Sequence, residues 1–244
     1  MFTLEARVGA SQVDAAGLLQ YGALLDLMQD CSGFQLDTEA GLNAYFRESN
    51  IGMYLASRQI ELFRRPAYGE RVQLFTSIYD CKRVYGYRNT WMLDADCKVC
   101  AASYCIGVFI QLATGRPVRV PDAVIKSVNF AEPYPMPYLP HKLSLPDASA
   151  PWQSGTPVPV LSYQIDRYHH MNNARYLDVA AAFLPEGFPC GRIRIAYRMP
   201  AKLGDMLYPR ICQAAESCMI SLTDADGKSY ADVEFSQGEP VSQV

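Results

Sequence analysis

Residues 164–178 read QIDRYHHMNNARYLD, and a weaker copy of this stretch lies at residues 12–26, which read QVDAAGLLQYGALLD. Both copies open with Gln, an aliphatic residue and Asp, and both close with Leu-Asp at the same spacing. Similarity of this kind within one chain indicates an internal repeat. The pair therefore predicts two copies of one structural unit.

The likeness continues in the same order along both halves of the chain. Phe63–Ala67 (FRRPA) lines up with Tyr197–Ala201 (YRMPA), Gly69-Glu70 with Gly204-Asp205 after one inserted residue, and Asp94–Lys98 (DADCK) with Asp224–Lys228 (DADGK). Several separate matches in one order favour duplication over chance.

Each half combines one amphipathic helix with several extended runs. In the first half we expect a strand at Phe2–Val8, a helix at 21–36 and strands at 52–64, 71–80, 84–93 and 99–111. In the second half we expect a strand at 158–165, a helix at 173–183 and strands near 191–198, 206–214, 216–223 and 229–235. This α+β pattern predicts a bent antiparallel sheet wrapped on a central helix, the hot-dog fold. Two tandem hot-dog units would pair edge to edge and so remove an exposed sheet edge.

A proline-rich segment separates the two halves. Ten of the sixteen prolines lie within residues 114–160, where they exclude a long helix or a central strand. We therefore expect an N-terminal hot-dog unit at 1–115, a linker at 116–157 and a C-terminal unit at 158–244 that carries the loop of the opening stretch.

The composition is that of a soluble globular protein, with 50% hydrophobic and 19% charged residues. The net charge of −3 disfavours nucleic acid as the main partner. No apolar run approaches the length of a membrane span, and the first residues lack the basic and apolar regions of a signal peptide. We expect no membrane association.

Eight cysteines are spread along the chain, which indicates free thiols in a cytoplasmic protein. Cys97-Lys98-Val99-Cys100 has metal-ligand spacing, but no second CxxC pair supplies the four ligands of a structural zinc site. The chain also lacks a GxSxG serine motif and a glycine-rich phosphate loop. We expect no metal and no cofactor.

The loop in the opening stretch combines groups that can do acyl-transfer chemistry. Asp166 and His170 flank a short turn, and Asn173 stands where a helix N-cap is expected. Free amides at that helix N-terminus can stabilise an oxyanion, and the acid or the imidazole can activate water. In the purely structural alternative, Asp166 and His170 pair with each other or with the backbone and fix the loop.

The first copy of the loop bears on this choice. It keeps the acid as Asp14, but has Leu18 at the position of His170 and Gln20 at that of Asn172. The turn therefore does not require the histidine, which favours a special role for His170. His169 has no such claim.

The sequence resembles the acyl-ACP thioesterase family, which includes bacterial members and the plant fatty acyl-ACP thioesterases. The resemblance covers nearly the whole chain. It is carried by Tyr54–Glu61 (YLASRQIE), Arg65–Glu70 (RPAYGE), Thr114–Asp122 (TGRPVRVPD) and His170-Met171-Asn172-Asn173-x-x-Tyr176, which is similar to the family's HVNNxxY.

The resemblance implies a tandem hot-dog enzyme that hydrolyses the thioester between a fatty acyl chain and the phosphopantetheine arm of acyl carrier protein. In the family motif DxNxHVNN, Asp166 matches the acid and His170 the histidine, whereas Tyr168 replaces an asparagine. The Glu or Cys that follows a Tyr-Arg-Arg run in the family is missing, because Pro200-Ala201 stands there.

The assignment of the base stays open between two residues. Either Asp166 acts directly while His170 positions water or the carbonyl, or His170 is the base and Asp166 orients it. Tyr168, Asn172 and Asn173 are supporting candidates, and backbone amides of residues 172–174 are candidate oxyanion donors.

Substrate and assembly also have alternatives. An acyl-CoA thioesterase would use the same loop chemistry, and a noncatalytic acyl-binding module would explain the missing third group. Leu24, Leu25 and Met28 are candidates for the acyl tunnel or for the ordinary core. The arginines at 64, 65, 192, 194 and 198 are either a docking patch for the acidic carrier protein or members of local ion pairs. A homodimer stays open.

Overall fold

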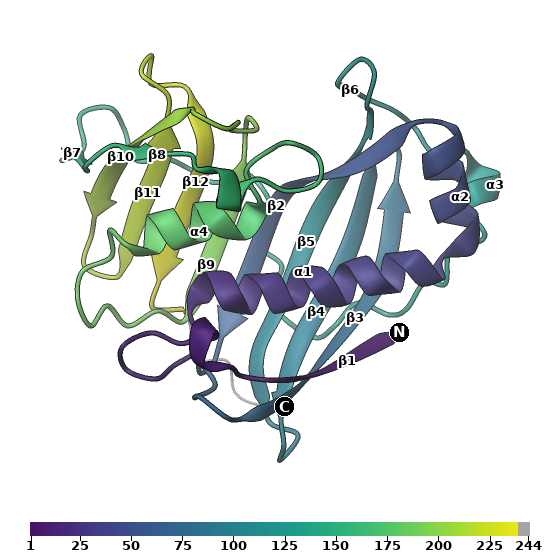
Figure 1. Ribbon diagram of the computed structural model, residues 1–244, viewed down its shortest axis with the longest axis horizontal. Helices are drawn as coiled ribbons and strands as arrows, with labels where there is room; N and C mark the ends of the chain where they lie inside the picture. Colours follow the sequence, from purple (N-terminus) through teal and green to yellow (C-terminus); the bar gives the residue numbers. More distant parts are fainter. Residues whose placement is uncertain (239–244) are drawn as a thin grey trace.

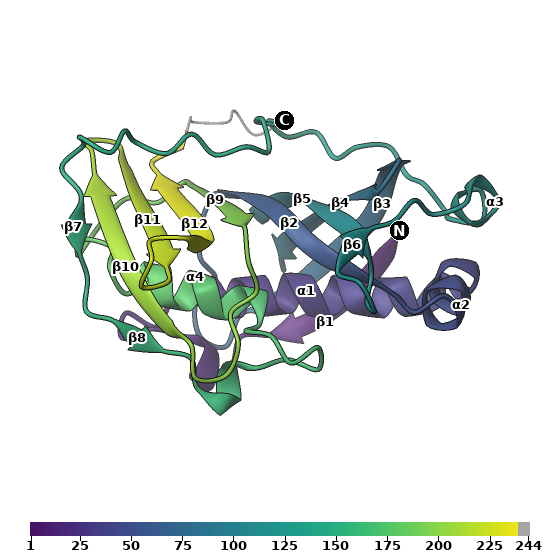
Figure 2. The ribbon, with the colours of Figure 1, turned by 90° about the horizontal axis from the view of Figure 1, so that it is seen from above.

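The computed structural model describes residues 1–238, which form one continuous antiparallel sheet curved around two helices (Figure 1). The twelve-stranded sheet has the order β1-β3-β4-β5-β2-β9-β12-β11-β10-β7, with β6 on β5 and β8 on β10. Seen from above, the helices α1 and α4 lie on the same side of the sheet (Figure 2). The expected tandem hot-dog architecture is confirmed.

The first half contains the longer helices and strands. Its elements are β1 (Phe2–Arg7), α1 (Tyr21–Thr38), α2 (Ala40–Glu48), β2 (Ile51–Leu62), β3 (Arg71–Lys82), β4 (Tyr85–Asp94), β5 (Val99–Gln111) and β6 (Arg116–Pro117). Between the halves lie α3 (Asp122–Ile125) and β7 (Gln153–Ser154). The second half contains β8 (Val158–Pro159), α4 (Asn173–Ala181), β9 (Arg192–Tyr197), β10 (Met206–Gln213), β11 (Ser217–Thr223) and β12 (Ser229–Ser236).

The two halves join through β2 and β9. Ser57–Glu61 pairs with Arg192–Ala196 in antiparallel register. At the end of this ladder, Arg192 Nε donates to Glu61 Oε1 over 2.7 Å, and both side chains are largely buried. The edge-to-edge pairing expected from the sequence therefore occurs within one chain.

One hydrophobic core lies beneath both helices. Leu25 of α1 and Leu177 of α4 occupy equivalent positions of the repeat, and both are fully buried. The predicted strand at 158–165 is mostly wrong, because the chain turns after β8. There the Leu161 amide donates to the side-chain oxygen of Gln164 over 2.8 Å. Helix α2 was not predicted, since Leu42 and Phe46 are its only buried residues and leave a sparse apolar pattern.

The repeat alignment needs one correction. The amide of Leu19 donates to the carbonyl of Pro66, whereas the amide of the equivalent Met171 donates to Ala201. The pairing of Phe63–Ala67 with Tyr197–Ala201 is therefore wrong by one residue, because the inserted residue precedes this strand end. Pro200 is the structural counterpart of Arg65.

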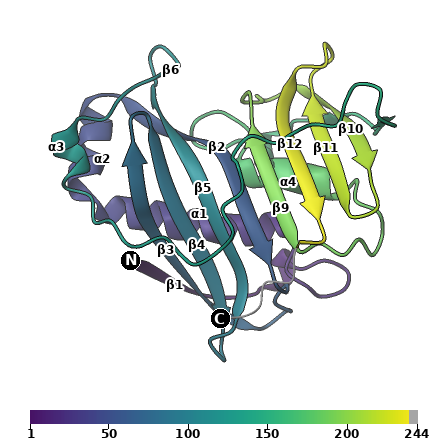
Figure 3. The same cartoon turned by 180° about the vertical axis from the view of Figure 1, so that it is seen from behind.

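The proline-rich linker crosses the sheet face opposite the helices (Figure 3). Its backbone is fixed by polar side chains of the sheet: the Tyr134 amide donates to Asn89, and Gln59 donates to the carbonyl of Pro137 over 2.9 Å. The proposed unit boundaries around 116–157 stay a prediction. All eight cysteines are free thiols. Among residues 1–238, no helix is both long and apolar enough to cross a membrane.

Candidate active site

The turn after Asp166 repeats the turn after Asp14 bond for bond. Oδ1 of Asp166 accepts the amides of Tyr168 at 2.8 Å and His170 at 3.4 Å. Oδ1 of Asp14 accepts the amides of the equivalent Ala16 at 2.9 Å and Leu18 at 3.1 Å. One carboxylate oxygen therefore builds the turn in both halves.

The second carboxylate oxygen differs between the two copies. Oδ2 of Asp14 lies 2.6 Å from Nη1 of Arg65. Burial raises the pKa of Asp14, but hydrogen bonds from Arg65 and from the turn amides outweigh it and lower the pKa. Oδ2 of Asp166 has no hydrogen-bond or ion-pair partner within residues 1–238, since Pro200 stands in place of Arg65. The second half thus leaves this oxygen free to bind or activate a ligand.

His169 and His170 have different roles in the turn. His169 adopts φ 61°, the left-handed region that the equivalent Gly17 adopts at φ 75°. His170 follows at the end of the turn and is half-buried. In the described chain, its imidazole makes no hydrogen bond to the carboxylate of Asp166. The structure therefore does not support the pairing of these two side chains, either as a loop clamp or as a base with its orienter.

Tyr54 of β2 completes the site from the first half, and sequence reasoning did not single it out. Its ring packs edge-on against His170 with centroids 5.8 Å apart, and lies 6.3 Å from the ring of Tyr168. Burial, together with the charge of Asp166, raises the pKa of Tyr54. The phenol is therefore a neutral hydrogen-bond donor. Only its place in the YLASRQIE motif could have suggested it.

The N-terminus of α4 is capped by Asn172, so the prediction of Asn173 as the N-cap is wrong by one residue. Oδ1 of Asn172 accepts the Ala174 amide at 2.8 Å, and Gln29 of α1 donates to the same oxygen at 3.3 Å. The Asn172 amide donates to the carbonyl of Gln164. Of the three candidate oxyanion donors, only the Asn173 amide lacks an acceptor in the part of the chain that the structure covers.

Tyr168 lies at the rim of the site with 40% of its surface exposed. The guanidinium of Arg167 lies 5.0 Å from its ring centroid and donates to its hydroxyl over 3.1 Å. Tyr168 therefore covers one side of the loop beside Tyr54. Its contacts are those of a packing residue rather than of the amide it replaces.

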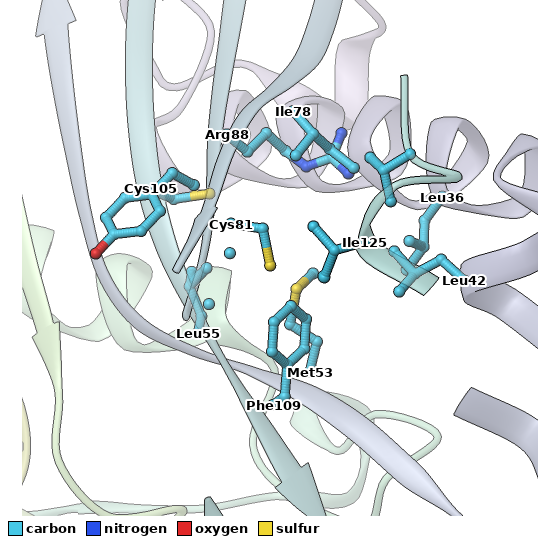
Figure 4. Close-up of a pocket in the computed structure, with 14 residues that line it drawn as sticks. Leu36, Leu42, Met53, Leu55, Ile78, Cys81, Arg88, Cys105, Phe109 and Ile125 are labelled. Carbon is cyan, nitrogen blue, oxygen red and sulfur yellow. The ribbon is translucent and has the colours of Figure 1, made fainter. Parts of the chain in front are cut away.

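An apolar pocket lies in the first half of the chain (Figure 4). It contains about 470 Å³ of space unfilled by atoms, part of it open to solvent. Met53 and Leu55, which flank Tyr54 on β2, line the pocket together with residues of α1, α2, α3, β3, β4 and β5. The pocket therefore begins on the same stretch of β2 that contacts His170.

Two glycines on neighbouring strands let the pocket-lining side chains of Met53 and Phe109 lie close to the sheet. Gly86 of β4 pairs with Gly107 of β5. A Cβ on Gly107 would lie 2.7 Å from Cγ of Met53, and one on Gly86 would lie 3.2 Å from Cζ of Phe109. Side chains at these positions would collide with Met53 and Phe109 and push them into the pocket.

Leu24, Leu25 and Met28 do not line this pocket. All three are at most 1% exposed and belong to the central core. Their side chains face inward near the start of α1, whereas the pocket lies beneath its C-terminal end at Leu36. Their burial agrees with the core alternative, and a role of these residues in an acyl tunnel stays a prediction.

The arginines considered as a docking patch all bind neighbouring carboxylates. The pairs are Arg64 with Glu70 and Asp94, Arg65 with Asp14, Arg192 with Glu61, Arg194 with Glu234, and Arg198 with Asp232. The local ion-pair alternative therefore describes them better than a free basic surface. No group of three or more potential metal ligands occurs within residues 1–238.

Comparisons with known proteins agree with this architecture. The model of the Thioesterase-like superfamily matches residues 8–128. An acyl-ACP thioesterase from Bacteroides thetaiotaomicron superposes with a TM-score of 0.86 at 20% identity, covering 96% of both chains. The 12:0-ACP thioesterase from Umbellularia californica gives 0.82 at 15% identity, again covering 96% of both chains. A protein described as an oleoyl thioesterase from Lactobacillus plantarum gives 0.84 at 20% identity, covering 98% of this chain and 97% of that one. No curated protein matches at a significant level.

Proposed function

We propose that this protein hydrolyses acyl thioesters, with fatty acyl-ACP as the substrate, because the model of the Thioesterase-like superfamily matches residues 8–128. One observation carries the proposal. The loop of Asp166 and His170, with a carboxylate oxygen that has no partner among residues 1–238, meets Tyr54 of β2, and the flanking Met53 and Leu55 line an apolar pocket. The whole-chain similarity to acyl-ACP thioesterases supports the choice of carrier.

Asp166 is the proposed general base. Its free Oδ2 accepts a proton from a water molecule, which attacks the thioester carbonyl carbon. Oδ1 stays bonded to the amides of Tyr168 and His170, so the carboxylate keeps its orientation during this step. The missing Glu or Cys at Pro200-Ala201 is then not needed for water activation.

The negative charge that develops on the carbonyl oxygen needs hydrogen-bond donors, placed away from the attacking water. The Asn173 amide at the N-terminus of α4 is a candidate, since a helix N-terminus stabilises negative charge. The imidazole of His170 and the phenol of Tyr54 are the neighbouring side-chain donors. Collapse of the tetrahedral intermediate expels the pantetheine thiolate, which takes up the proton held by Asp166.

A direct assay tests the proposal. Purified protein is incubated with acyl-ACP and with acyl-CoA of the same acyl group, and free acid and free thiol are measured. Steady release from acyl-ACP is the expected result, and tight binding without turnover would favour the noncatalytic module. Acyl-CoA is the second candidate, because the ion-paired arginines do not form a free basic surface for the acidic carrier protein. A higher kcat/KM for acyl-CoA than for acyl-ACP would establish it.

His170→Ala is expected to lower kcat by about tenfold to a hundredfold, the effect of losing a hydrogen bond to a charged group. The fold should persist, because only the backbone of His170 takes part in the turn, through its amide and its carbonyl. His169→Gly is the matched control, since Gly17 occupies the same left-handed position in the other copy. It should keep wild-type activity. Equal losses of kcat in His170→Ala and His169→Gly would mean that His170 has no special role.

Gly107→Val is expected to narrow the pocket and lower kcat/KM for long acyl chains about tenfold relative to short ones. The new side chain would collide with Met53 in the middle of the pocket. Gly33→Ala serves as the control, because Gly33 is exposed on α1 and its Cβ would meet no atom within 4 Å. A chain-length profile that is unchanged in Gly107→Val would mean that acyl chains bind elsewhere.

A further inference from the structure

Two arginines lie buried on the face of the sheet that contacts the helices. Arg58 of β2 is 3% exposed and Arg88 of β4 is 5% exposed. Both pair with Cys105 of the intervening strand β5, so they stand in one row across three strands. The next row toward Met53 contains Gly107 and Gly86, which line the pocket.

Neither guanidinium has a carboxylate partner. Within residues 1–238, no ion pair involves Arg58 or Arg88. Nη1 of Arg88 donates to the hydroxyl of Thr76 over 3.1 Å, and Nη1 of Arg58 donates to Ser103 over 3.2 Å. Nε of Arg58 is buried and makes no hydrogen bond in the described structure. Nη1 of Arg58 also lies 3.9 Å from the sulfur of Met28, so among residues 1–238 only the two Nη1 atoms have acceptors.

This arrangement is costly for a side chain with only a packing role. Buried charges in proteins are normally paired and hydrogen-bonded. Burial is the main cause that lowers the pKa of Arg88, and the positive charge of Arg58 adds to it, whereas Cys105, Cys31 and Glu39 partly offset this shift. Glu39 itself is bound by Gln35 at 2.7 Å. The region therefore has an excess of donors and positive charge.

Arg88 is the member of the pair that reaches the pocket. It lines the cavity together with apolar side chains such as Ile78, Leu55 and Leu36 (Figure 4). An unsubstituted hydrocarbon chain would leave its free N–H groups without acceptors and would exclude water from them. An oxygen atom carried by the acyl chain would supply the acceptor that the protein lacks.

We propose that the pocket takes an acyl group with an oxygen function, a hydroxyl or a carboxylate, on its hydrocarbon chain, and that Arg88 selects it. The inference rests on the proposed hydrolysis of acyl thioesters and narrows its substrate class. The role of Arg88 is specificity, since it binds the acyl chain away from the thioester. Arg58 adds positive charge beside it.

Binding of free acids tests the inference without requiring turnover. A series of fatty acids of one chain length is used: unsubstituted, carrying a single hydroxyl group moved along the chain, or carrying a terminal carboxylate. Isothermal titration with wild-type protein should give at least one oxygenated acid a dissociation constant about tenfold or more below that of the unsubstituted acid. A wild-type protein that binds the unsubstituted acid as tightly as every oxygenated one overturns the proposal.

Variants of Arg88 separate selection from folding. Arg88→Met keeps the length of the side chain without its donors and should abolish the preference, whereas Arg88→Lys should retain part of it. A preference that persists in folded Arg88→Met also overturns the proposal. The same ratio is then measured as kcat/KM on the matching thioesters. Selective binding by a protein that hydrolyses none of them would contradict the proposed function but leave this inference intact.

Discussion

Asp166→Asn is expected to lower kcat for acyl thioester hydrolysis by about a hundredfold to ten-thousandfold, the range for loss of a positioned general base. The amide oxygen of asparagine can still accept the amides of Tyr168 and His170, so the turn should form as before. What disappears is the basic Oδ2, which has no hydrogen-bond or ion-pair partner in the described part of the chain. Thermal melting should stay close to that of the wild type while turnover is lost.

Asp14→Asn is the internal control, because Asp14 builds the same turn in the first half. This variant should keep full activity and lose about 1 kcal/mol or less of stability with the partly exposed Arg65 pair. Because the folded pKa of Asp14 is lowered, its contribution is present at neutral pH and is lost as the pH falls through that value. Wild-type turnover in Asp166→Asn would mean that Asp166 only builds the turn.

The sequence predicts the fold well because the repeated residues also make the repeated hydrogen bonds. Gln12 and Gln164 each accept an amide three residues before them, at 2.8 Å in both copies. The acids at 14 and 166 each close the turn that follows. A local motif that fixes its own backbone can be recognised in a sequence, and two copies identify the halves.

The site was predicted less completely because it depends on contacts between distant segments. Tyr54 meets His170 only after β2 and β9 have paired, and Gly86 lies beside Gly107 only through strand register. In a sequence, a core residue such as Leu25 cannot be distinguished from a residue that lines a tunnel, because both are apolar. Backbone hydrogen bonds show that Pro200 is the structural counterpart of Arg65. A sequence alignment does not contain these bonds, so it does not fix the position of the one-residue gap.

The central claim is that the second half converts a turn-building acid into a base by removing its ion-pair partner. Pro200→Arg restores a guanidinium at the position from which Arg65 binds Asp14. Pro200 is exposed, so the longer side chain has room. The new ion pair would occupy Oδ2 of Asp166, so that this oxygen could no longer take a proton from water.

The decisive measurement is kcat for acyl-ACP in Pro200→Arg beside Pro200→Gln, a neutral side chain that equally removes the proline. The account predicts that kcat falls about a hundredfold or more in Pro200→Arg and stays near the wild-type value in Pro200→Gln. Both variants should be folded, with stabilities within about 1 kcal/mol of the wild type. Equal kcat values in the two folded variants would contradict the claim that the free oxygen of Asp166 activates water.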